Sequence, residues 1–289
     1  MGSYSIKELE QLSGIKAHTI RIWEKRHRII EPARTDTNIR YYSDAELKKI
    51  ISVSLLNNNG IKISKIADMT NDDLYKKVLE ISELKSDVTI HIDQLVMAMI
   101  DMEEEQFEKI LSNLILRYGF EKTITEITYP FLEKIGVLWQ TQNISPAQEH
   151  FISNLIRQKM IVAIDGLPIP PHEAKRVVLY LREKELHEIG LLFYHYIVRK
   201  SGYRTYYLGQ NVPHEDLFQV VKQHKAEILV TSITSGSELI TMEDYLSKLS
   251  SDFPQNRLFI SGMQLANYNG PVPDNVVLFK NALALKDLL

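Results

Sequence analysis

The spacing of hydrophobic positions divides this chain into a helical amino-terminal part and a mixed carboxyl-terminal part. From residue 176 onward, short apolar runs alternate with amphipathic segments. Such runs are typical of buried strands, and the 3.6-residue period between them is typical of helices. Their alternation favours a five-stranded, doubly wound parallel sheet. The predicted strands are 176–181, 203–208, 227–232, 257–261 and 276–280, and the predicted helices are 188–200, 214–224, 237–250 and 282–288.

The segment from 72 to 165 is predicted to be helical throughout. Apolar residues at 90–100 and 107–116 have amphipathic spacing, and a further helix is expected to begin at Ser145-Pro146. Four or five helices of this length form a bundle. Methionine is a flexible core filler, so we expect Met97, Met99 and Met102 to lie in the bundle core.

The first seventy residues predict short helices joined by tight turns. Ser5 and Glu8 have the spacing of a capping box, in which each side chain satisfies a backbone amide of the other. Gly14 ends this helix, and a second helix is predicted from about 17 to 26. Two helices joined by a glycine turn form a helix-turn-helix, whose second helix enters the major groove of DNA. Residues 32–42 predict a hairpin wing whose basic side chains contact phosphates.

The composition is that of an ordinary globular protein large enough for several domains. The chain has 289 residues, of which 44% are hydrophobic and 25% charged. It has no cysteine, which excludes disulfides and thiolate metal sites and suits the cytoplasm. Neither a signal peptide nor a membrane span is evident, so we expect a cytoplasmic protein without a membrane partner. The predicted domains are 1–72, 73–170 and 171–289.

The charge is unevenly distributed along the chain. Residues 1–70 carry 12 Lys and Arg against 8 Asp and Glu, whereas the remainder carries 22 against 29. A basic segment on an acidic body predicts that nucleic-acid contacts lie at the amino end. The candidate DNA-binding residues are Lys16, His18, Thr19, Arg21, Lys25, Arg34, Arg40 and Tyr41.

Residues 4–70 resemble the MerR-type winged helix-turn-helix. The resemblance rests on the run Thr19 to Arg26, on Arg34-Thr35, on Arg40-Tyr41-Tyr42-Ser43 and on the ending Gly60-x-x-Ile63-x-x-Ile66. It implies double-stranded operator DNA as a partner. The long dimerisation helix usual after this domain is not evident, because the periodicity breaks at 69–73. Lys16 stands where a capping Ser or Thr is usual, which weakens the helix start by about 1 kcal/mol.

The run Glu185-Leu186-His187-Glu188-Ile189-Gly190 lies between a predicted strand and a predicted helix. Open α/β sheets bind ligands at this edge, beyond the carboxyl ends of their strands. A carboxylate two residues before a histidine can orient the imidazole and fix its tautomer, and a glycine three residues later permits close approach. The pattern predicts that His187 binds a metal held by a large cofactor. For the motif alone, a histidine in a surface turn is the alternative.

The carboxyl-terminal part resembles the cobalamin-binding domain of methionine synthase and methylmalonyl-CoA mutase, which has a flavodoxin-like fold. Its D-x-H-x-x-G element corresponds to Glu185, His187 and Gly190, and its S-x-L element to Ser232-Ile233-Thr234 after 41 intervening residues. The resemblance implies that His187 is the lower ligand of the cobalt. It also implies that the displaced nucleotide tail passes Ser232, Thr234 and Gly262. Thr234 replaces a leucine and Met263 a second glycine, and either change could narrow the tail channel.

The order of the three parts resembles the light-sensing, cobalamin-dependent repressors of the CarH and LitR type. Trp139, followed after nine residues by Glu149-His150, matches that family's mark for adenosylcobalamin. The resemblance implies that Trp139 covers the adenosyl group, with Glu149 and His150 beside it. It further implies a homo-oligomer, tetramer or dimer, that binds DNA when loaded. Light would break the cobalt–carbon bond and release the DNA.

The leading hypothesis is therefore a transcriptional repressor, not an enzyme, controlled by adenosylcobalamin and by light. A second hypothesis keeps DNA binding but has a cofactor pocket that has degenerated at Thr234 and Met263. A third is a corrinoid-dependent enzyme component. The fused DNA-binding domain and the lack of a (β/α)-barrel substrate domain disfavour this third hypothesis.

Overall fold

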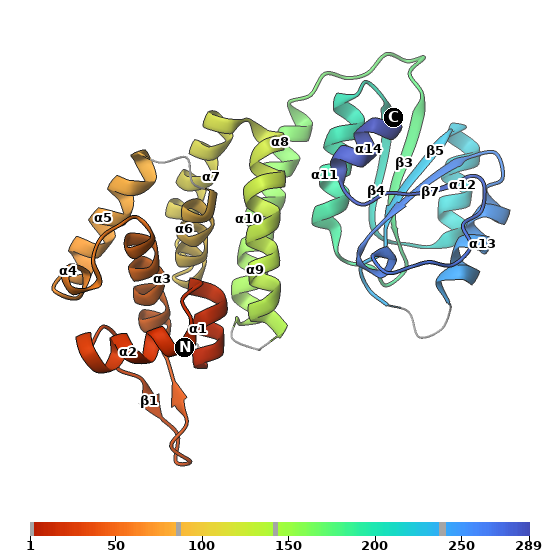
Figure 1. Cartoon of the computed structure of the whole chain (residues 1–289). Helices are drawn as coiled ribbons and strands as arrows, with labels where there is room; N and C mark the ends of the chain where they lie inside the picture. Colours follow the sequence, from red (N-terminus) through yellow and green to blue (C-terminus); the bar gives the residue numbers. More distant parts are fainter. Residues whose placement is uncertain (1–2, 85–87, 141–143, 237–240) are drawn as a thin grey trace. The chain divides into compact units, whose positions relative to one another are not determined.

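The protein forms two compact units, Met1–Leu155 and Ile156–Leu289 (Figure 1). The computed structural model describes residues 3–84, 88–140, 144–236 and 241–289, apart from the side chains at 75, 79, 82–84 and 137–140. Within the described residues, no helix is long and apolar enough to cross a membrane.

The first unit begins with the predicted helix-turn-helix. The predicted capping box forms at Ser5 with Glu8, and a second capping box forms at Ser43 with Glu46. Gly14 ends the first helix in the left-handed conformation, with φ of 71°. The elements of this part are α1 (Ile6–Ser13), α2 (Ala17–His27), β1 (Ala33–Arg34), β2 (Arg40–Tyr41), α3 (Asp44–Asn58), α4 (Ile63–Ala67) and α5 (Asn71–Leu84).

Helix α2 starts without a cap from its own N-cap side chain, Lys16, as the sequence predicts. Glu10 of α1 takes over this role. Its carboxylate accepts hydrogen bonds from the amide of Ala17 at 2.9 Å and from Nζ of Lys16 at 3.0 Å. The amide bond, followed by the bond from Lys16, lowers the pKa of Glu10. The turn between α1 and α2 is thereby fixed by a neighbouring helix.

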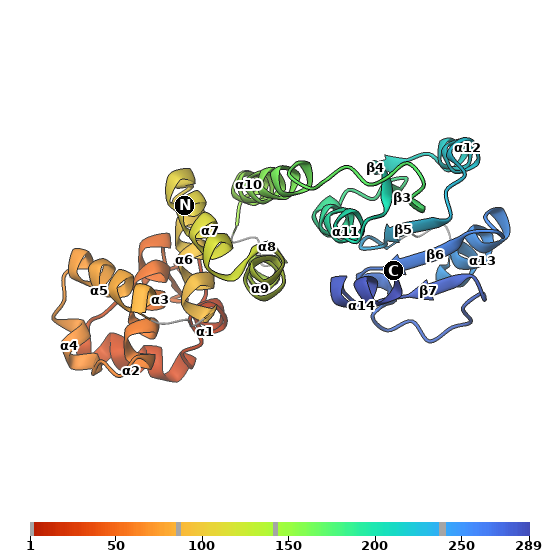
Figure 2. The same ribbon diagram turned by 90° about the horizontal axis from the view of Figure 1, so that it is seen from above.

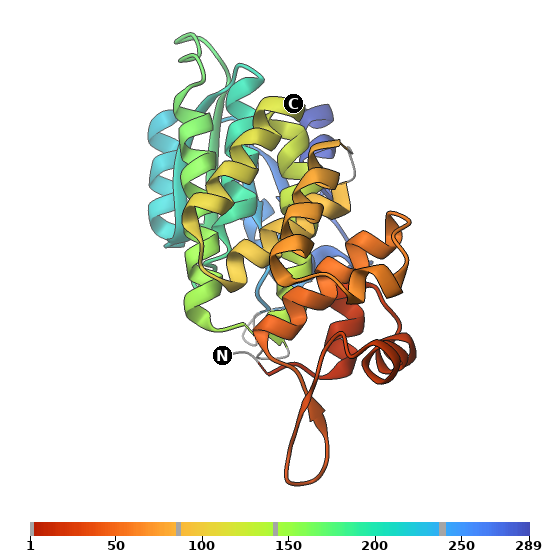
Figure 3. The ribbon, with the colours of Figure 1, turned by 90° about the vertical axis from the view of Figure 1, so that its left-hand side faces the viewer.

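The wing is a short antiparallel hairpin that extends from the helices of the first unit (Figure 3). Ala33 pairs with Tyr41 and Arg34 with Arg40. Behind it, an isolated bridge joins Tyr4 to Tyr42. Both of these tyrosines are fully buried, which ties the base of the wing to the start of α1.

The helical bundle packs within the same unit as the DNA-binding part, because α3 contacts α6 as well as α5. Its elements are α6 (Val88–Ile100), α7 (Glu104–Tyr118), α8 (Phe120–Thr123), the π-helical segment η1 (Ile124–Thr128), α9 (Tyr129–Gln140) and α10 (Pro146–Asp165). Helix α6 is buried on nearly all sides from Ile90 to Ile100, as expected for a central helix.

The predicted methionine core is confirmed in part. Met97 and Met99 are buried, at 8% and 0% exposure. For Met102 the prediction is wrong, since it is 45% exposed. It lies just beyond the end of α6 in the left-handed region, at φ 54°. Helix α6 ends at Ile100, two residues before Met102, so the helical period that predicted a core position does not extend to Met102.

The second unit is the predicted five-stranded parallel sheet, with strand order β4-β3-β5-β6-β7. Helices α11 and α14 cover one face and α12 and α13 the other (Figure 2). Its elements are β3 (Arg176–Arg182), α11 (Glu188–Lys200), β4 (Arg204–Val212), α12 (His214–His224), β5 (Ile228–Ser232), α13 (Met242–Asp252), β6 (Arg257–Ser261), the 3₁₀ turn η2 (Met263–Leu265), β7 (Val276–Leu278) and α14 (Ala282–Leu288).

The ends of some elements differ from the prediction. Strand β4 runs to Val212, four residues past the predicted end, with register shifts against β3. Helix α13 begins at Met242, where Thr241 caps it. The predicted start of this helix lies at 237–240, outside the described residues. The strand order reverses at β3, which lies between β4 and β5, so the topological switch point lies between β3 and β5.

A stability prediction follows from Gly262, whose φ is 120°. A Cβ built there would lie 2.2 Å from the carbonyl oxygen of Ile233, a backbone atom directly after β5 that cannot move freely. Gly262→Ala should therefore lower the free energy of unfolding by about 3 kcal/mol, measured by urea denaturation without ligand. Gly190→Ala is the matched control, because no described protein atom lies within 4 Å of its Cβ position. An equal loss of stability in both variants would contradict this account.

Candidate functional site

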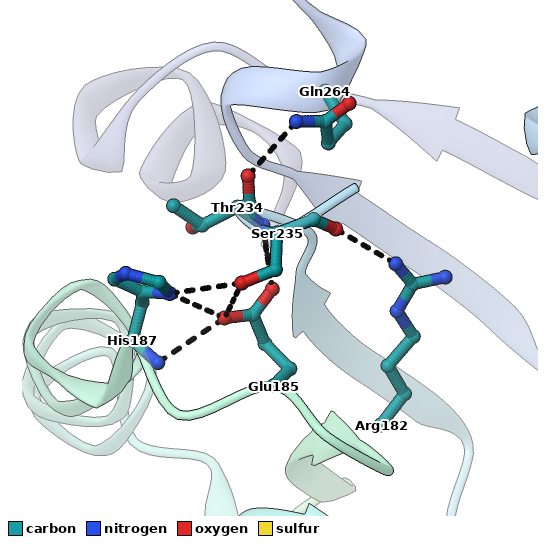
Figure 4. Close-up of polar contacts among 6 residues, drawn as sticks. All are labelled: Arg182, Glu185, His187, Thr234, Ser235 and Gln264. Carbon is teal, nitrogen blue, oxygen red and sulfur yellow. Dashed lines mark hydrogen bonds and ion pairs between the residues drawn. The ribbon is translucent and has the colours of Figure 1, made fainter. Parts of the chain in front are cut away.

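The carboxyl end of β3 leads into the loop that carries the candidate metal ligand, His187. This residue is the N-cap of α11, and its side chain is 62% exposed. Its Nδ1 lies 2.6 Å from Oε1 of Glu185 (Figure 4). Since a carboxylate accepts hydrogen bonds, Nδ1 carries the proton and Nε2 keeps its lone pair. The predicted orientation of His187 by Glu185 is thus present in the structure.

Glu185 joins two loops of the sheet edge. Its Oε2 accepts hydrogen bonds from the amides of Thr234 at 2.9 Å and Ser235 at 2.6 Å. Its Oε1 accepts from the His187 amide at 3.2 Å, in addition to the imidazole, and from Oγ of Ser235 at 3.2 Å. The carboxylate therefore holds the loop after β3 against the loop after β5.

The Glu185 carboxyl is buried, at 1% exposure, yet it is ionised. Burial raises its pKa, but the hydrogen bonds from the Ser235 amide, His187 and the Thr234 amide outweigh this effect. Together they hold the pKa at about 2. A fixed negative charge therefore lies next to Nδ1 of His187 over the whole physiological pH range.

The candidate residues after β5 and β6 lie at the same edge of the sheet. Ser232 is buried at the end of β5 and pairs in register with Ser261 of β6. Thr234 is half-buried, and its carbonyl accepts a hydrogen bond from Gln264 at 3.0 Å. Gly262 begins the turn against Ile233. The predicted elements around His187 thus converge, although they lie far apart in the sequence.

The two departures from the resembled motif do not fill this edge with side chains. Met263 is 72% exposed, so its side chain extends into solvent instead of packing between β5 and β6. Thr234 is engaged through its backbone, with Glu185 and Gln264. At Gly190, in the first turn of α11, the Cβ position is free of described protein atoms within 4 Å.

Sequence reasoning missed several residues of this site. Ser235 follows the predicted Ser232-Ile233-Thr234 element by one position and contacts both Glu185 and His187. Arg182 donates to the Ser235 carbonyl at 2.8 Å. Glu188 accepts hydrogen bonds from Tyr207 at 2.8 Å and from Gln210. The adjacency of Ser235 to a named element was a usable signal, whereas the partners from β4 carry no motif.

The bundle residues of the predicted cofactor site lie in the other unit. The side chain of Trp139 falls outside the described part of the structure. Glu149 lies in the first turn of α10, where it accepts hydrogen bonds from His150 at 2.6 Å and from Ser153 at 2.5 Å. The imidazole of His150 is 71% exposed.

The candidate DNA-binding residues lie on α2 and the wing. Arg21 and Lys25 are exposed on α2, whereas Lys16 forms an ion pair with Glu10. His18 and Thr19 contact each other at 3.3 Å. On the wing, Arg34 donates to Asn38 at 2.6 Å, Arg40 forms an ion pair with Glu24 at 3.1 Å, and Tyr41 is 38% exposed.

Comparison with protein families assigns the two helical parts. Residues 4–73 match the family described as MerR HTH family regulatory protein, and residues 91–163 match the B12 binding domain family. The chain therefore combines a region that matches MerR-type helix-turn-helix proteins with a region that matches B12-binding domains. From these two regions, the chain binds DNA and a cobalamin. The matched B12-binding region corresponds to helices α6 to α10.

Two curated relatives span both parts of this regulator. The chain is 25% identical to the HTH-type transcriptional repressor CarH of Myxococcus xanthus, over 88% of this chain and 86% of that one. It is 24% identical to the repressor CarA of the same organism, over 78% and 75%. A monomethylamine corrinoid protein of Methanosarcina barkeri has a similar fold, with a TM-score of 0.55, 16% identity, and coverage of 68% of this chain and 96% of that one.

The charge on Glu185 predicts a pH dependence of stability. Its folded pKa, about 2, lies below the ordinary value of 4.5. The folded form therefore binds the proton less readily than the unfolded form, and the stabilisation present above pH 4.5 is lost as the pH falls toward 2. Glu185→Gln should lower the free energy of unfolding at neutral pH by about 3 kcal/mol and flatten the curve in this window.

His195 of α11 provides the control, because it acts in a different pH window. Burial, followed by the charge of Arg199, lowers its pKa from 6.5 to about 4. The unfolded form is protonated first, so stability is lost as the pH falls from 6.5 to 4. His195→Gln should flatten that slope and leave the lower window unchanged, measured by denaturation at stepped pH. A Glu185→Gln curve parallel to the unaltered one at all pH values would contradict the role of Glu185.

Proposed function

We propose that this protein is a transcriptional repressor controlled by cobalamin, with His187 as the lower ligand of the cobalt. The observation that supports this most strongly is the state of the His187 imidazole. Its Nδ1 is bound to a buried carboxylate, while 62% of the side chain is exposed. An imidazole held in this way offers Nε2 as a ligand, and a carboxylate partner raises its basicity.

The residues around His187 fit a corrinoid. Cobalamin, when bound, would supply a cobalt that takes an imidazole nitrogen as a ligand and, in its alkyl forms, a light-sensitive bond to carbon. Glu185 fixes the ring orientation of His187, and the free space at Gly190 lets a large flat group approach the start of α11. The exposed apolar side chains of Leu186 and Met263 flank this edge and can cover the lower face of a macrocycle.

For the other side of the cofactor we infer the adenosyl form, with Trp139, Glu149 and His150 as its contacts. This rests on the spacing of the three residues and on the similarity to CarH. The Glu149 carboxylate is already bonded to His150 and Ser153. It therefore holds the His150 ring in one orientation, in which Nε2 of the neutral ring can accept a hydrogen bond from a ligand.

The DNA-binding role rests on the winged helix-turn-helix. Arg21 and Lys25 on the exposed face of α2 are proposed to contact the major groove and its phosphates, together with Lys16, His18 and Thr19. Arg34, Arg40 and Tyr41 are proposed to contact the backbone from the wing. The charge of Arg40 is partly balanced by Glu24, so the contribution of Arg40 to DNA affinity is expected to be smaller than that of Arg34.

Regulation is proposed to act through assembly. A ligand favours an assembled state only by its higher affinity for that state. Several DNA readers on one assembly then gain affinity through effective concentration. We infer a homo-oligomer, tetramer or dimer, that binds operator DNA in the cytoplasm when loaded. Light is inferred to be the releasing signal. The domain division 1–72, 73–170 and 171–289 remains part of this proposal.

The cofactor proposal predicts the spectrum of the loaded protein. Mixed with adenosylcobalamin in the dark, the protein should give a coloured complex that His187→Ala weakens at least about tenfold, with loss of the histidine-bound absorption. Glu185→Gln should weaken binding by about 10–100-fold. His172→Ala, a change at an exposed histidine before β3, is the matched control. A protein that remains colourless with excess cofactor would instead support the degenerate pocket.

The DNA proposal predicts a loss of phosphate contacts. Against an operator selected from random-sequence DNA, Arg21→Ala and Lys25→Ala should each weaken binding and reduce the slope of log affinity against log salt by about 1. Lys109→Ala, at an exposed lysine of α7, is the control and should leave the slope unchanged. Unaltered slopes in all three variants would exclude this face of α2 as the interface.

The light proposal predicts a change in both size and DNA affinity. The dark adenosylcobalamin complex should run as an oligomer in size-exclusion chromatography and shift the operator in a gel. Illumination should reverse both, with at least about a tenfold loss of affinity. The methylcobalamin complex, illuminated in the same way, tests whether the adenosyl group is required. DNA binding that is equal in light and dark would disprove the light response and leave the cobalamin site standing.

A further inference from the structure

A cavity lies at the carboxyl edge of the sheet, on the face covered by α12 and α13. Its volume is about 460 Å³. Tyr180 and Arg182 of β3, Val212 of β4, and Leu217 and Leu249 of α12 and α13 line it. His187 is not among the lining residues, whereas its partners Glu185 and Ser235 are. The cavity therefore adjoins the His187 site at the switch point of the sheet, where doubly wound folds bind ligands.

The charges at this cavity favour an anion. Arg182, Lys184 and Lys248 contribute cationic groups. Lys248 is balanced by Asp252 at 2.8 Å, while Lys184 has no ion-pair partner among the described residues. Of the two lining carboxylates, Glu185 is turned to His187 and Ser235, and Glu183 is exposed. Arg182 uses one nitrogen for the Ser235 carbonyl, which leaves further donors on its guanidinium.

A buried hydroxyl at this cavity lacks a well-aligned hydrogen bond. The side chain of Tyr180 is 2% exposed, and its hydroxyl lies near those of Tyr245 and Thr231 without forming a well-aligned hydrogen bond to a described residue. Burial, and then the neighbouring Tyr245, raises the pKa of Tyr180 well above its usual range, so the hydroxyl stays protonated and is a donor. A buried polar group without a partner costs about 1–3 kcal/mol, which an acceptor atom in the cavity would recover.

We propose that this cavity binds a small organic carboxylate with an apolar body. Val212, Leu217 and Leu249 provide the apolar walls. The guanidinium of Arg182 and the ammonium of Lys184 face the carboxylate, and the Tyr180 hydroxyl donates to one of its oxygens. Apolar walls with a few convergent polar groups are the usual design of small-molecule sites. A free inorganic anion would gain nothing from these walls.

The bound carboxylate acts on His187 through a short chain of contacts (Figure 4). Arg182 donates to the carbonyl of Ser235, and the amide of the same residue donates to Glu185. Glu185 in turn holds Nδ1 of His187. A ligand that draws Arg182 toward itself moves Ser235 and thereby the support of the imidazole. By thermodynamic reciprocity, occupancy of the His187 site changes carboxylate affinity by the same factor.

The site is tested on the full-length protein without cobalamin, so that it does not depend on the proposed function. Hexanoate and benzoate are titrated calorimetrically, with 1-hexanol, benzyl alcohol and inorganic phosphate as comparison probes. We expect saturable binding of the carboxylates, weakened at least about tenfold in Tyr180→Phe and in Lys184→Gln. Lys175→Gln is the matched control, because Lys175 is exposed and directly precedes β3, at the end of that strand opposite to the cavity. Thermal unfolding of each variant checks that it folds.

Each contrary outcome overturns a defined part. The proposed site is disproved if neither carboxylate binds saturably. It is also disproved if Tyr180→Phe and Lys184→Gln bind the carboxylates as tightly as the unaltered protein does. Alcohols that bind as tightly as the acids, or phosphate that binds more tightly, overturn the carboxylate assignment. The coupling is read from the ring resonances of His187, assigned by their loss in His187→Ala. These should shift as hexanoate or benzoate saturates, and unshifted resonances at saturation disprove the coupling.

Discussion

The site depends on one buried carboxylate, that of Glu185. It accepts hydrogen bonds from backbone and side-chain donors of His187, Thr234 and Ser235, and so joins the ends of two neighbouring parallel strands. Burying an ionised group is unfavourable unless its oxygens are satisfied. Here they are, and the same bonds fix the tautomer and direction of the imidazole. The hydrogen bonds of the Glu185 carboxylate thus both stabilise the sheet edge and orient His187 for binding a metal.

The DNA-binding residues and His187 belong to different units of the protein. The DNA-binding helices and the bundle form one unit, in which α3 packs on α6, and the sheet that carries His187 forms the other. The division between the units falls within α10. Its first turn carries Glu149 and His150, and its second half carries Arg157, which lies 3.4 Å from Glu188, the residue after His187.

Local rules predicted much of the fold and part of the site. The Ser5–Glu8 capping box, the turn at Gly14 and the buried strands depend on residues close in the chain, and they appear where the spacing predicted, although strand β4 extends to Val212. The pairing of Glu185 with His187 is also local, at two residues apart. The contacts of Ser235, Arg182 and Gln210 join segments that only the sheet topology brings together, and no periodicity encodes them. Met102 was misassigned because a left-handed residue ends the helix earlier than its apolar pattern does.

The most direct test of the central claim is electron paramagnetic resonance of the protein loaded with cob(II)alamin. The unpaired electron on the metal couples to the nucleus of the nitrogen below it. With histidine labelled by nitrogen-15, the superhyperfine triplet should become a doublet, and His187→Ala should abolish the change. A triplet that persists after labelling would mean that the cofactor keeps its own base, and that His187 is not the cobalt ligand.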